Sequence, residues 1–308
     1  MGDIIHALPA VASWRQSFPQ HRITWVVAGK WVQLLEGNPH IDQIMPFDRR
    51  GKGAIYRSWR TLRGMRPEIA IDFQGLIQSA LIGRAARPRN FIGLSRSQVR
   101  ESLAAFFYTQ QVTAVGPHCV ETNLQLSAAA GATQLTDQAW LPAGRPEGEL
   151  PSGPFVFASP FAGWASKQWP LDRYSLLADA LKAEGLPLVV NVPPGLSSKL
   201  AGIPGLMIHE SGIPGLIDAT RRAIAIVGVD SGPMHLAAAL GKPGVAIFGP
   251  TDPARNGPFH SRLMVLRDPN AKTTYKRNEG IDPSMLAITA GQVKEALLLS
   301  IRLASVSA

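Results

Sequence analysis

Residues 227–253 read VGVDSGPMHLAAALGKPGVAIFGPTDP, two short apolar runs with a helical stretch between them. Each apolar run has the length of one buried strand, and Pro233 is tolerated at the first position of a helix. A strand, a helix and a second strand in this order are typical of a parallel sheet. The stretch therefore predicts an α/β domain whose sheet is covered by helices.

The same alternation runs through the whole chain. In the second half, further strands are predicted at 155–159 and 186–192, and helices at 172–184 and 288–303. In the first half, strands are predicted at 22–28, 41–47 and 68–74, and helices at 3–18, 54–66 and 75–86. Both halves therefore predict a doubly wound, Rossmann-like α/β domain.

A Pro- and Gly-rich stretch without periodicity, LPAGRPEGELPSGP, lies between the halves at 141–154. It predicts a linker at about 142–153 between an N-terminal domain, 1–145, and a C-terminal domain, 154–308. The length of 308 residues suits two domains of about 150 residues each. Open α/β sheets bind ligands at the carboxyl ends of their strands, so we expect a site in a cleft between the domains.

The chain opens on a predicted helix, where a domain of this type usually opens on its central strand. Either the first strand of this domain is missing, or the true start codon lies upstream of Met1. We expect the second, because a sheet without its central strand leaves backbone groups unpaired.

Composition narrows the class of protein. Hydrophobic residues make up 45% of the chain and charged residues 17%, which indicates a globular protein. No apolar run approaches the roughly 20 residues of a membrane-spanning helix, and the N-terminus lacks the basic region of a signal peptide. The single cysteine, Cys119, excludes an intramolecular disulfide and a cysteine-based metal cluster. We therefore expect a cytoplasmic protein.

The net charge of +9 is concentrated in one segment. Residues 49–100 hold twelve basic residues against two acids, Glu68 and Asp72. Four arginines recur there at intervals of three and should lie near one side of a helix: Arg57, Arg60, Arg63 and Arg66. Each alone is most simply a solvated surface charge, but the cluster suits an anionic partner such as nucleic acid, an acidic membrane surface or a phosphorylated glycolipid. Few aromatic residues interleave it, so nucleic acid is not favoured.

Polar side chains gather where the strands of residues 223–229 and 244–249 end. The first strand is followed by Asp230, Ser231 and Gly232, and His235 lies in the first turn of the helix. Ser231 is a good N-cap, and a helix N-terminus binds phosphate through its free N–H groups and positive dipole end. Thr251 and Asp252 follow the second strand. Ser231 alone indicates only a capped helix, whereas the ensemble predicts a diphosphate site.

Three further segments carry candidate residues at strand ends. In SPFAGWASKQWP (159–170), Lys167 follows a small-residue loop and could neutralise a departing diphosphate. In GDIIHALPA (2–10), Asp3 could accept a proton from an attacking hydroxyl, although a helix dipole alone explains an acid there, and His6 could be a core histidine. In IDFQG (71–75), Gln74 could equally be a polar residue that ends a strand or a residue that contacts the substrate.

Taken in order, the stretches GDIIHALPA, DFQGLIQSALIGR, SKQWP, VGVDSGPMHLAAALGKP and FGPTDP resemble the signature segments of the lipopolysaccharide heptosyltransferases. The resemblance, closest to the heptosyltransferase I-like members, covers nearly the whole chain. It implies a GT-B fold, two Rossmann-like domains with the active site between them. It also implies inverting transfer of heptose from ADP-heptose, with neither metal nor cofactor, to a Kdo or heptose residue of the lipopolysaccharide inner core.

The resemblance also implies residue roles. By position, Asp3 matches the catalytic base and Lys167 the lysine that contacts the donor. Asp230, Ser231, Gly232 and His235 match the donor-binding turn, to which the GPTDP loop adds Thr251 and Asp252. His6, Gln74 and the arginines Arg57, Arg60 and Arg63 would then face a phosphorylated glycolipid acceptor, which the N-terminal domain holds at the inner face of the inner membrane.

The chain departs from the family pattern at two places. Ala162, Gly163 and Trp164 stand where the family commonly has small hydroxyl residues before the lysine. No acid follows the strand of residues 186–192, so Ser197 or Ser198 would have to hold the ribose.

Two alternative functions remain open at this point. A nucleotide-sugar epimerase would use the same scaffold without an acceptor, and a degenerate nucleotide-binding or membrane-surface protein would bind without turnover. A dinucleotide dehydrogenase is not favoured, because no G-x-G-x-x-G follows a predicted strand.

Overall fold

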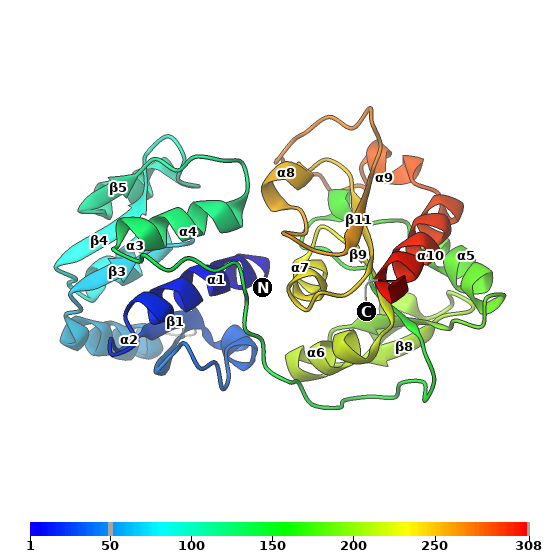
Figure 1. The fold of residues 1–308 in the computed structure, drawn as a ribbon, viewed down its shortest axis with the longest axis horizontal. Coiled ribbons are helices and arrows are strands. Elements are labelled where there is room, and N and C mark those ends of the chain that lie inside the picture. Colours follow the sequence, from blue (N-terminus) through cyan, green and yellow to red (C-terminus); the bar gives the residue numbers. More distant parts are fainter. Residues whose placement is uncertain (49–51, 307–308) are drawn as a thin grey trace. The chain divides into compact units, whose positions relative to one another are not determined.

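The computed structural model describes residues 1–48 and 52–306. The chain divides into two compact units, Asp3–Trp140 and Leu141–Ala308, the second joined by Met1–Gly2. We call these the N-terminal unit and the C-terminal unit. Within the described residues every strand pairing is parallel, so each unit is an α/β fold of the predicted kind (Figure 1).

The C-terminal unit is built on one six-stranded sheet in the order β11-β10-β9-β6-β7-β8. Its strands are β6 (Val156–Ser159), β7 (Leu188–Val192), β8 (Met207–Glu210), β9 (Ala225–Val229), β10 (Gly244–Phe248) and β11 (Leu263–Arg267). The chain runs outward from β6 to β8, then returns to the other side of β6 with β9. The order therefore reverses between β6 and β9, and a reversal of this kind opens a crevice at the carboxyl ends of the two strands.

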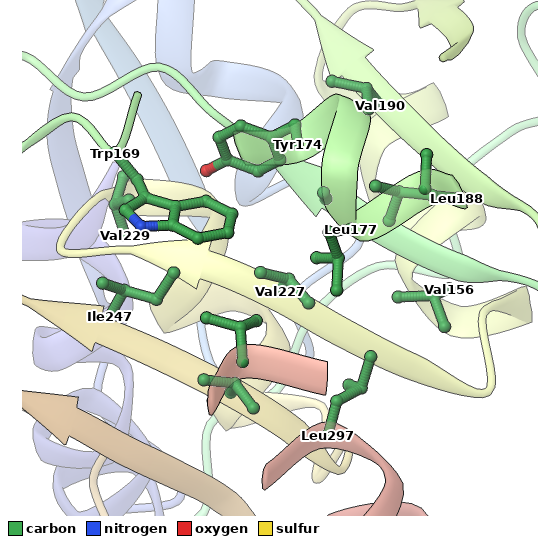
Figure 2. Packing of buried hydrophobic residues seen from close by; sticks show 14 of the residues in the cluster. Val156, Trp169, Tyr174, Leu177, Leu188, Val190, Val227, Val229, Ile247 and Leu297 are labelled. Atoms are coloured by element: carbon green, nitrogen blue, oxygen red, sulfur yellow. The ribbon is translucent and has the colours of Figure 1, made fainter. Parts of the chain in front are cut away.

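Helices and the apolar faces of the strands enclose the core of this unit. The helices are η3 (Ala165–Lys167), α5 (Leu171–Lys182), η4 (Ser197–Leu200), α6 (Ile213–Arg222), α7 (Gly232–Ala239), α8 (Pro253–Asn256), α9 (Pro283–Ala287) and α10 (Ala290–Val306). Figure 2 shows Trp169 and Tyr174 packed with aliphatic side chains such as Val229 and Leu177. Trp169 is fully buried, and its indole N–H donates to the Ile288 carbonyl oxygen at 2.9 Å. The polar atom of the largest core side chain is thereby satisfied.

The stretch predicted as a linker groups with the C-terminal unit and packs on it. The Arg145 N–H donates to the Pro214 carbonyl oxygen at 3.1 Å, and the Glu147 carboxylate accepts from the Gly212 N–H at 2.7 Å. Residues 141–153 therefore extend the unit along the start of α6, although their Pro and Gly content gives them no helix or strand.

The N-terminal unit contains two separate parallel sheets, β1-β2 and β3-β4-β5. Its strands are β1 (Thr24–Ala28), β2 (Gln43–Phe47), β3 (Ile69–Ile71), β4 (Asn90–Leu94) and β5 (Gln110–Val112). Its helices are α1 (Gly2–Ser17), η1 (Gly29–Leu34), α2 (Lys52–Met65), α3 (Ile77–Ala85), η2 (Ser102–Phe107) and α4 (Cys119–Ala129). As predicted, α1 precedes every strand of the described residues. Arg49 and Arg50, at the beginning of the basic segment, lie outside them.

Gly244 lies so close to the neighbouring strand β9 that replacing it should destabilise the C-terminal unit. Gly244 begins β10 with φ +145°, and a Cβ added there would lie 2.0 Å from the Ile226 carbonyl oxygen. Gly244→Ala should lower the free energy of unfolding by more than about 2 kcal/mol, through backbone strain and steric overlap together. Gly185→Ala is the control, since φ is +73° with no atom within 4 Å; it should cost about 1–2 kcal/mol. Urea denaturation of both variants measures the difference, and equal losses would contradict the overlap.

Candidate active site

The reversal of strand order brings the ends of β6, β9 and β10 together, because β9 lies between the other two. Lys167 ends η3 in the loop after β6, Asp230 follows β9 directly, and Thr251 follows β10. Lys167 lies 63 positions and Thr251 lies 21 positions from Asp230 along the chain, yet all three residues meet at one edge of the sheet. Parallel pairing therefore builds this side of the site from separate segments.

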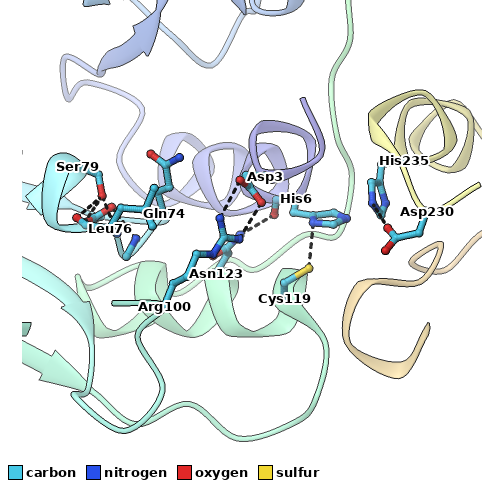
Figure 3. Close-up of polar contacts among 12 residues, drawn as sticks. Asp3, His6, Gln74, Leu76, Ser79, Arg100, Cys119, Asn123, Asp230 and His235 are labelled. Atoms are coloured by element: carbon cyan, nitrogen blue, oxygen red, sulfur yellow. Dashed lines mark hydrogen bonds and ion pairs between the residues drawn. The ribbon is translucent and has the colours of Figure 1, made fainter. Parts of the chain in front are cut away.

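Asp230 is the centre of a buried polar network. One carboxylate oxygen accepts from the Lys167 ammonium at 2.6 Å and from the Thr251 hydroxyl at 2.7 Å. The other lies 3.6 Å from the His235 Nε2 (Figure 3). Burial raises the pKa of Asp230, but the imidazole of His235 and the charge of Lys167 outweigh burial and hold this pKa well below its usual range. The carboxylate is therefore an anion that keeps two potential cations in place.

This geometry changes the role predicted for two donor-binding residues. The side chain of Asp230 is 6% exposed, and Thr251 is fully buried. Their polar atoms are used by the network, and a carboxylate would repel a diphosphate. Asp230 therefore holds the Lys167 ammonium and lies beside the His235 ring, while Thr251 binds the same carboxylate. Donor binding by Asp230 and Thr251 stays a prediction.

The N-terminus of α7 adds a second group of donors. Ser231 stands at the N-cap, as predicted, but the prediction that its side chain caps the helix is wrong. Pro233, at the second position of the helix, has no N–H and so removes one of the two donors that an N-cap side chain can use. The Ser231 Oγ is shielded from solvent and has no hydrogen-bond partner among the described residues. The hydroxyl therefore keeps an unused hydrogen-bonding capacity at the positive end of the helix.

The remaining predicted donor contact, Asp252, is occupied by local structure. It stands at the N-cap of α8 and accepts from the Ala254 N–H at 2.9 Å. A direct contact between this carboxylate and a donor stays a prediction.

The Trp164 ring lies beside two cationic side chains. Trp164 is one of the residues at which the chain departs from the family pattern. The Lys167 Nζ lies 4.3 Å from its ring centroid, and the Arg277 guanidinium lies 5.3 Å away. Sequence analysis missed Arg277, because it lies in an irregular segment whose charge pattern looks like ordinary surface. Cation–π contacts of this kind hold both positive groups beside the ring and add a second cation near Lys167.

In the N-terminal unit, Asp3 lies in the first turn of α1 and forms a two-pronged ion pair with Arg100 (Figure 3). Both carboxylate oxygens accept from the guanidinium, at 3.1 and 3.2 Å. The hydrogen bond to Asp3 raises the pKa of Arg100. About half of each side chain remains exposed. The paired geometry fixes the orientation of a carboxylate that substrates can still reach. Sequence analysis named Arg100 only as the end of a basic segment.

The loop that carries Gln74 is shaped by Asp72. The Asp72 carboxylate accepts from the N–H groups of Gln74 and Gly75 and from the hydroxyls of Ser79 and Tyr108, all within 3.1 Å. Burial and the neighbouring Asp72 charge raise the pKa of Tyr108 far above its usual value. Asp72 is therefore a structural residue, whereas the Gln74 side chain is exposed. The Gly75 carbonyl oxygen accepts from the Glu101 N–H at 3.0 Å, which ties this loop to the segment of Arg100.

The remaining predicted acceptor contacts are His6, which is buried, and three arginines of α2. His6 is 8% exposed, and its Nδ1 lies 2.9 Å from the Cys119 Sγ (Figure 3). The Asn123 amide donates to its carbonyl oxygen at 3.0 Å. These contacts favour the core histidine over a direct acceptor contact. The arginines of α2 are exposed: Arg57, Arg60 and Arg63. Acceptor binding by these four residues stays a prediction.

Within residues 1–48 and 52–306, no group of three or more His, Cys, Asp or Glu residues could hold a metal ion. No helix in that part of the chain is long and apolar enough to cross a membrane.

The fold and the site together define a two-unit α/β protein with a cluster of Lys167, Asp230 and His235 at the switch point of one sheet. Residues 55–283 match glycosyltransferase family 9 (heptosyltransferase), about three quarters of the chain, and the chain belongs to this family. It is 29% identical over 282 residues to lipopolysaccharide heptosyltransferase 1 of Pseudomonas aeruginosa, covering 84% of this chain and 79% of that protein. The namesake in Escherichia coli K12 is 28% identical over 295 residues, with 87% and 91% covered.

Solved structures agree on the fold. Escherichia coli heptosyltransferase WaaC with ADP aligns with a TM-score of 0.77 at 23% identity, over 96% of this chain and 95% of that one. Escherichia coli ADP-heptose lipopolysaccharide heptosyltransferase II aligns with a TM-score of 0.78 at 22% identity, over 99% and 96%. The predicted α/β, GT-B-type fold and the predicted glycosyltransferase of the heptosyltransferase family are confirmed. The comparisons support this function rather than an epimerase or a protein without turnover.

The buried Asp230 network generates a prediction about stability and pH. Asp230→Asn should lower the free energy of unfolding by about 3–5 kcal/mol near pH 7, because Lys167 would stay buried without its charged partner. The folded pKa of Asp230 lies below its unfolded value of about 3.9. The stabilisation by its charge is thus fully present above that pH and is lost as the pH falls through the folded pKa.

Denaturation midpoints from pH 7 down to pH 3 measure this effect. The gap between wild type and Asp230→Asn should stay constant at neutral pH and begin to narrow as the pH falls below about 4. The control is Asp179→Asn on α5, an exposed carboxylate whose loss should change stability by less than about 0.5 kcal/mol. A gap independent of pH down to 3 would contradict the ionised network.

Proposed function

We propose that this protein is an inverting glycosyltransferase that moves heptose from ADP-heptose to a Kdo or heptose residue of the lipopolysaccharide inner core. Its relatives are named lipopolysaccharide heptosyltransferases, and solved relatives are described with ADP and with ADP-2-deoxy-2-fluoro heptose. The observation that carries the proposal is the Lys167–Asp230 pair, set at the switch point beside the unoccupied hydroxyl of Ser231.

The C-terminal unit would bind the donor. In this proposal Lys167 and His235 face the diphosphate, and the Ser231 hydroxyl and Gly232 N–H bind its oxygens at the start of α7. Charge develops on the diphosphate as its bond to the anomeric carbon breaks. Donors held in place before the reaction stabilise that charge, and removal of one such donor typically costs roughly 10²–10³ in rate. Asp230 and Thr251 would keep Lys167 from moving as the charge appears.

The N-terminal unit would bind the acceptor. Asp3 takes the proton from the acceptor hydroxyl, the hydroxyl oxygen attacks the anomeric carbon from the side opposite the diphosphate, and ADP leaves. Arg100 holds both oxygens of Asp3 and therefore sets the direction in which the base points. The exposed Gln74 and the guanidinium of Arg100 would contact the polar groups of an anionic glycolipid. Such an acceptor would place the protein at the inner face of the inner membrane.

The donor identity generates the first test. Isothermal titration should give tighter binding of ADP than of UDP, and Lys167→Gln should weaken ADP binding by about 10–100-fold, the worth of a charged hydrogen bond. Lys182→Gln, which removes an exposed lysine on α5 of the same unit, is the control and should bind ADP normally. Thermal midpoints must be recorded for each variant, because Lys167 also stabilises Asp230. Preference for UDP would refute the proposed donor.

The proposed base generates the second test. Asp3→Asn should lower kcat by at least about 10²-fold, the lower range for a positioned general base. ADP affinity should stay unchanged, because every proposed donor contact lies in the C-terminal unit. Arg100→Lys keeps the charge but not the two-pronged geometry, so it should lower kcat less than Asp3→Asn does. Loss of ADP binding in a folded Asp3→Asn variant would mean that Asp3 serves the donor and not the acceptor.

A further inference from the structure

The N-terminal unit carries an apolar cleft outside the candidate active site. Its volume is about 460 Å³. Two polar residues, Gln78 and Glu101, line it together with Phe47 of β2 and with apolar side chains of α2 and α3: Ile55, Trp59, Ile77, Leu81 and Ile82. The Glu101 carboxylate accepts from the Ile77 N–H at the start of α3. Neither the donor nor the acceptor chemistry proposed above uses these side chains. The cleft therefore calls for an apolar occupant of its own.

The helix beside the cleft exposes large apolar side chains. On α2, Leu62 is 1% exposed and packs into the core, whereas Ile55 is 43%, Tyr56 66% and Trp59 36% exposed. On α3, Leu81 is 41% exposed. Single exposed apolar residues are ordinary, but several around one open cleft mark an interaction surface.

Positive charge surrounds these apolar side chains. Ile55, Trp59 and Leu62 lie at positions i, i+4 and i+7, which form one stripe along α2. Three exposed arginines follow the adjoining face: Arg57, Arg60 and Arg63. The described part of α2 has no acidic residue, and no ion pair to these arginines occurs within the residues that the structure describes. Arg84 is also exposed on α3, one turn after Leu81.

We propose that α2 and α3 form a docking surface for an anionic phospholipid bilayer, with α2 lying in the interface and the cleft taking part of an acyl chain. A basic helix with Trp, Tyr and Ile beside its arginines has the composition of helices that lie in the headgroup region. Arginines attract the negative surface of the membrane, while the exposed side chains of Ile55, Tyr56 and Trp59 insert. This inference rests on the proposed function only for its purpose, which is to bring the enzyme to a membrane-bound acceptor.

Vesicle flotation tests the charged part of this surface, with the full chain and with neither donor nor acceptor present. The protein should bind vesicles that contain phosphatidylglycerol and should bind pure phosphatidylcholine vesicles far more weakly. The triple variant R57Q/R60Q/R63Q should bind about a hundredfold more weakly, since each arginine near such a surface contributes roughly fivefold. The Lys triple R57K/R60K/R63K should retain binding. A second control, K182Q/K199Q/R302Q, removes three exposed cations of the C-terminal unit and should bind like wild type.

The apolar part needs a separate readout. Leu81→Ser should weaken binding to the anionic vesicles several-fold, whereas Leu299→Ser, at a leucine 46% exposed on α10, should not. Lipids brominated on the acyl chain should quench the tryptophan fluorescence of wild type. That quenching should fall in Trp59→Phe, which keeps an aromatic ring in the cleft.

The outcomes separate this inference from the proposed function. ADP titration with R57Q/R60Q/R63Q should match wild type, because α2 holds no proposed donor contact. Normal ADP binding with no preference for anionic vesicles would overturn the docking surface and leave the proposed donor intact. Binding of single-stranded RNA that exceeds vesicle binding and is lost in the same triple variant would assign α2 to nucleic acid and also overturn the proposal.

Discussion

A single buried carboxylate organises the candidate donor site. Asp230 follows β9, which lies between β6 and β10 in the sheet. Its carboxylate binds Lys167 from the loop after β6 and Thr251 from the loop after β10. Removing a charge from water is unfavourable unless partners replace the solvent, so Asp230 requires Lys167 and Thr251 to be where they are. Lys167 in turn requires Asp230, because its side chain is only 14% exposed. The site is therefore pre-formed by the needs of a buried anion, and the ligand charge meets cations that are already oriented.

The second feature is that two carboxylates are buried and hydrogen-bonded, whereas a third is exposed. Asp72 and Asp230 both follow strands, are both buried and are both saturated with hydrogen bonds. Asp3 differs, because it pairs with Arg100 at the surface and about half of its side chain is exposed. A general base must reach the proton it removes, so exposure distinguishes Asp3 from the other two. The two buried acids hold loops and cations in place, whereas the exposed Asp3 has the access that the proposed base requires.

The sequence predicted the sheets better than the contacts. Long apolar runs such as those of β7, β9 and β10 were predicted within two or three residues, because parallel strands buried on both faces read as continuous apolar segments. Four strands were missed: β4, β5, β8 and β11. β5 is three residues long and contains two glutamines, so it has no apolar pattern of its own and is recruited by pairing with β4. The roles of Asp230 and Arg100 also could not be predicted. They depend on which strands become neighbours, and that order is a property of the tertiary fold.

The arginines of α2 could be placed on one helix face from their spacing, but their partner could not be predicted. Intervals of three predicted one helix face for Arg57, Arg60 and Arg63, and these residues do lie on α2 with their side chains exposed. Spacing alone made a solvated charge the simplest explanation of each arginine. It left an acidic membrane surface and a phosphorylated glycolipid open as partners of the cluster, and it did not favour nucleic acid. An apolar cleft against α3 and an exposed Trp59 adjoin the charge, which supports the bilayer that we propose. A solvated face needs no cleft, and a fully polar polyanion needs no apolar wall. A bilayer surface uses both features at once, since its headgroups are anionic and its interior is hydrocarbon.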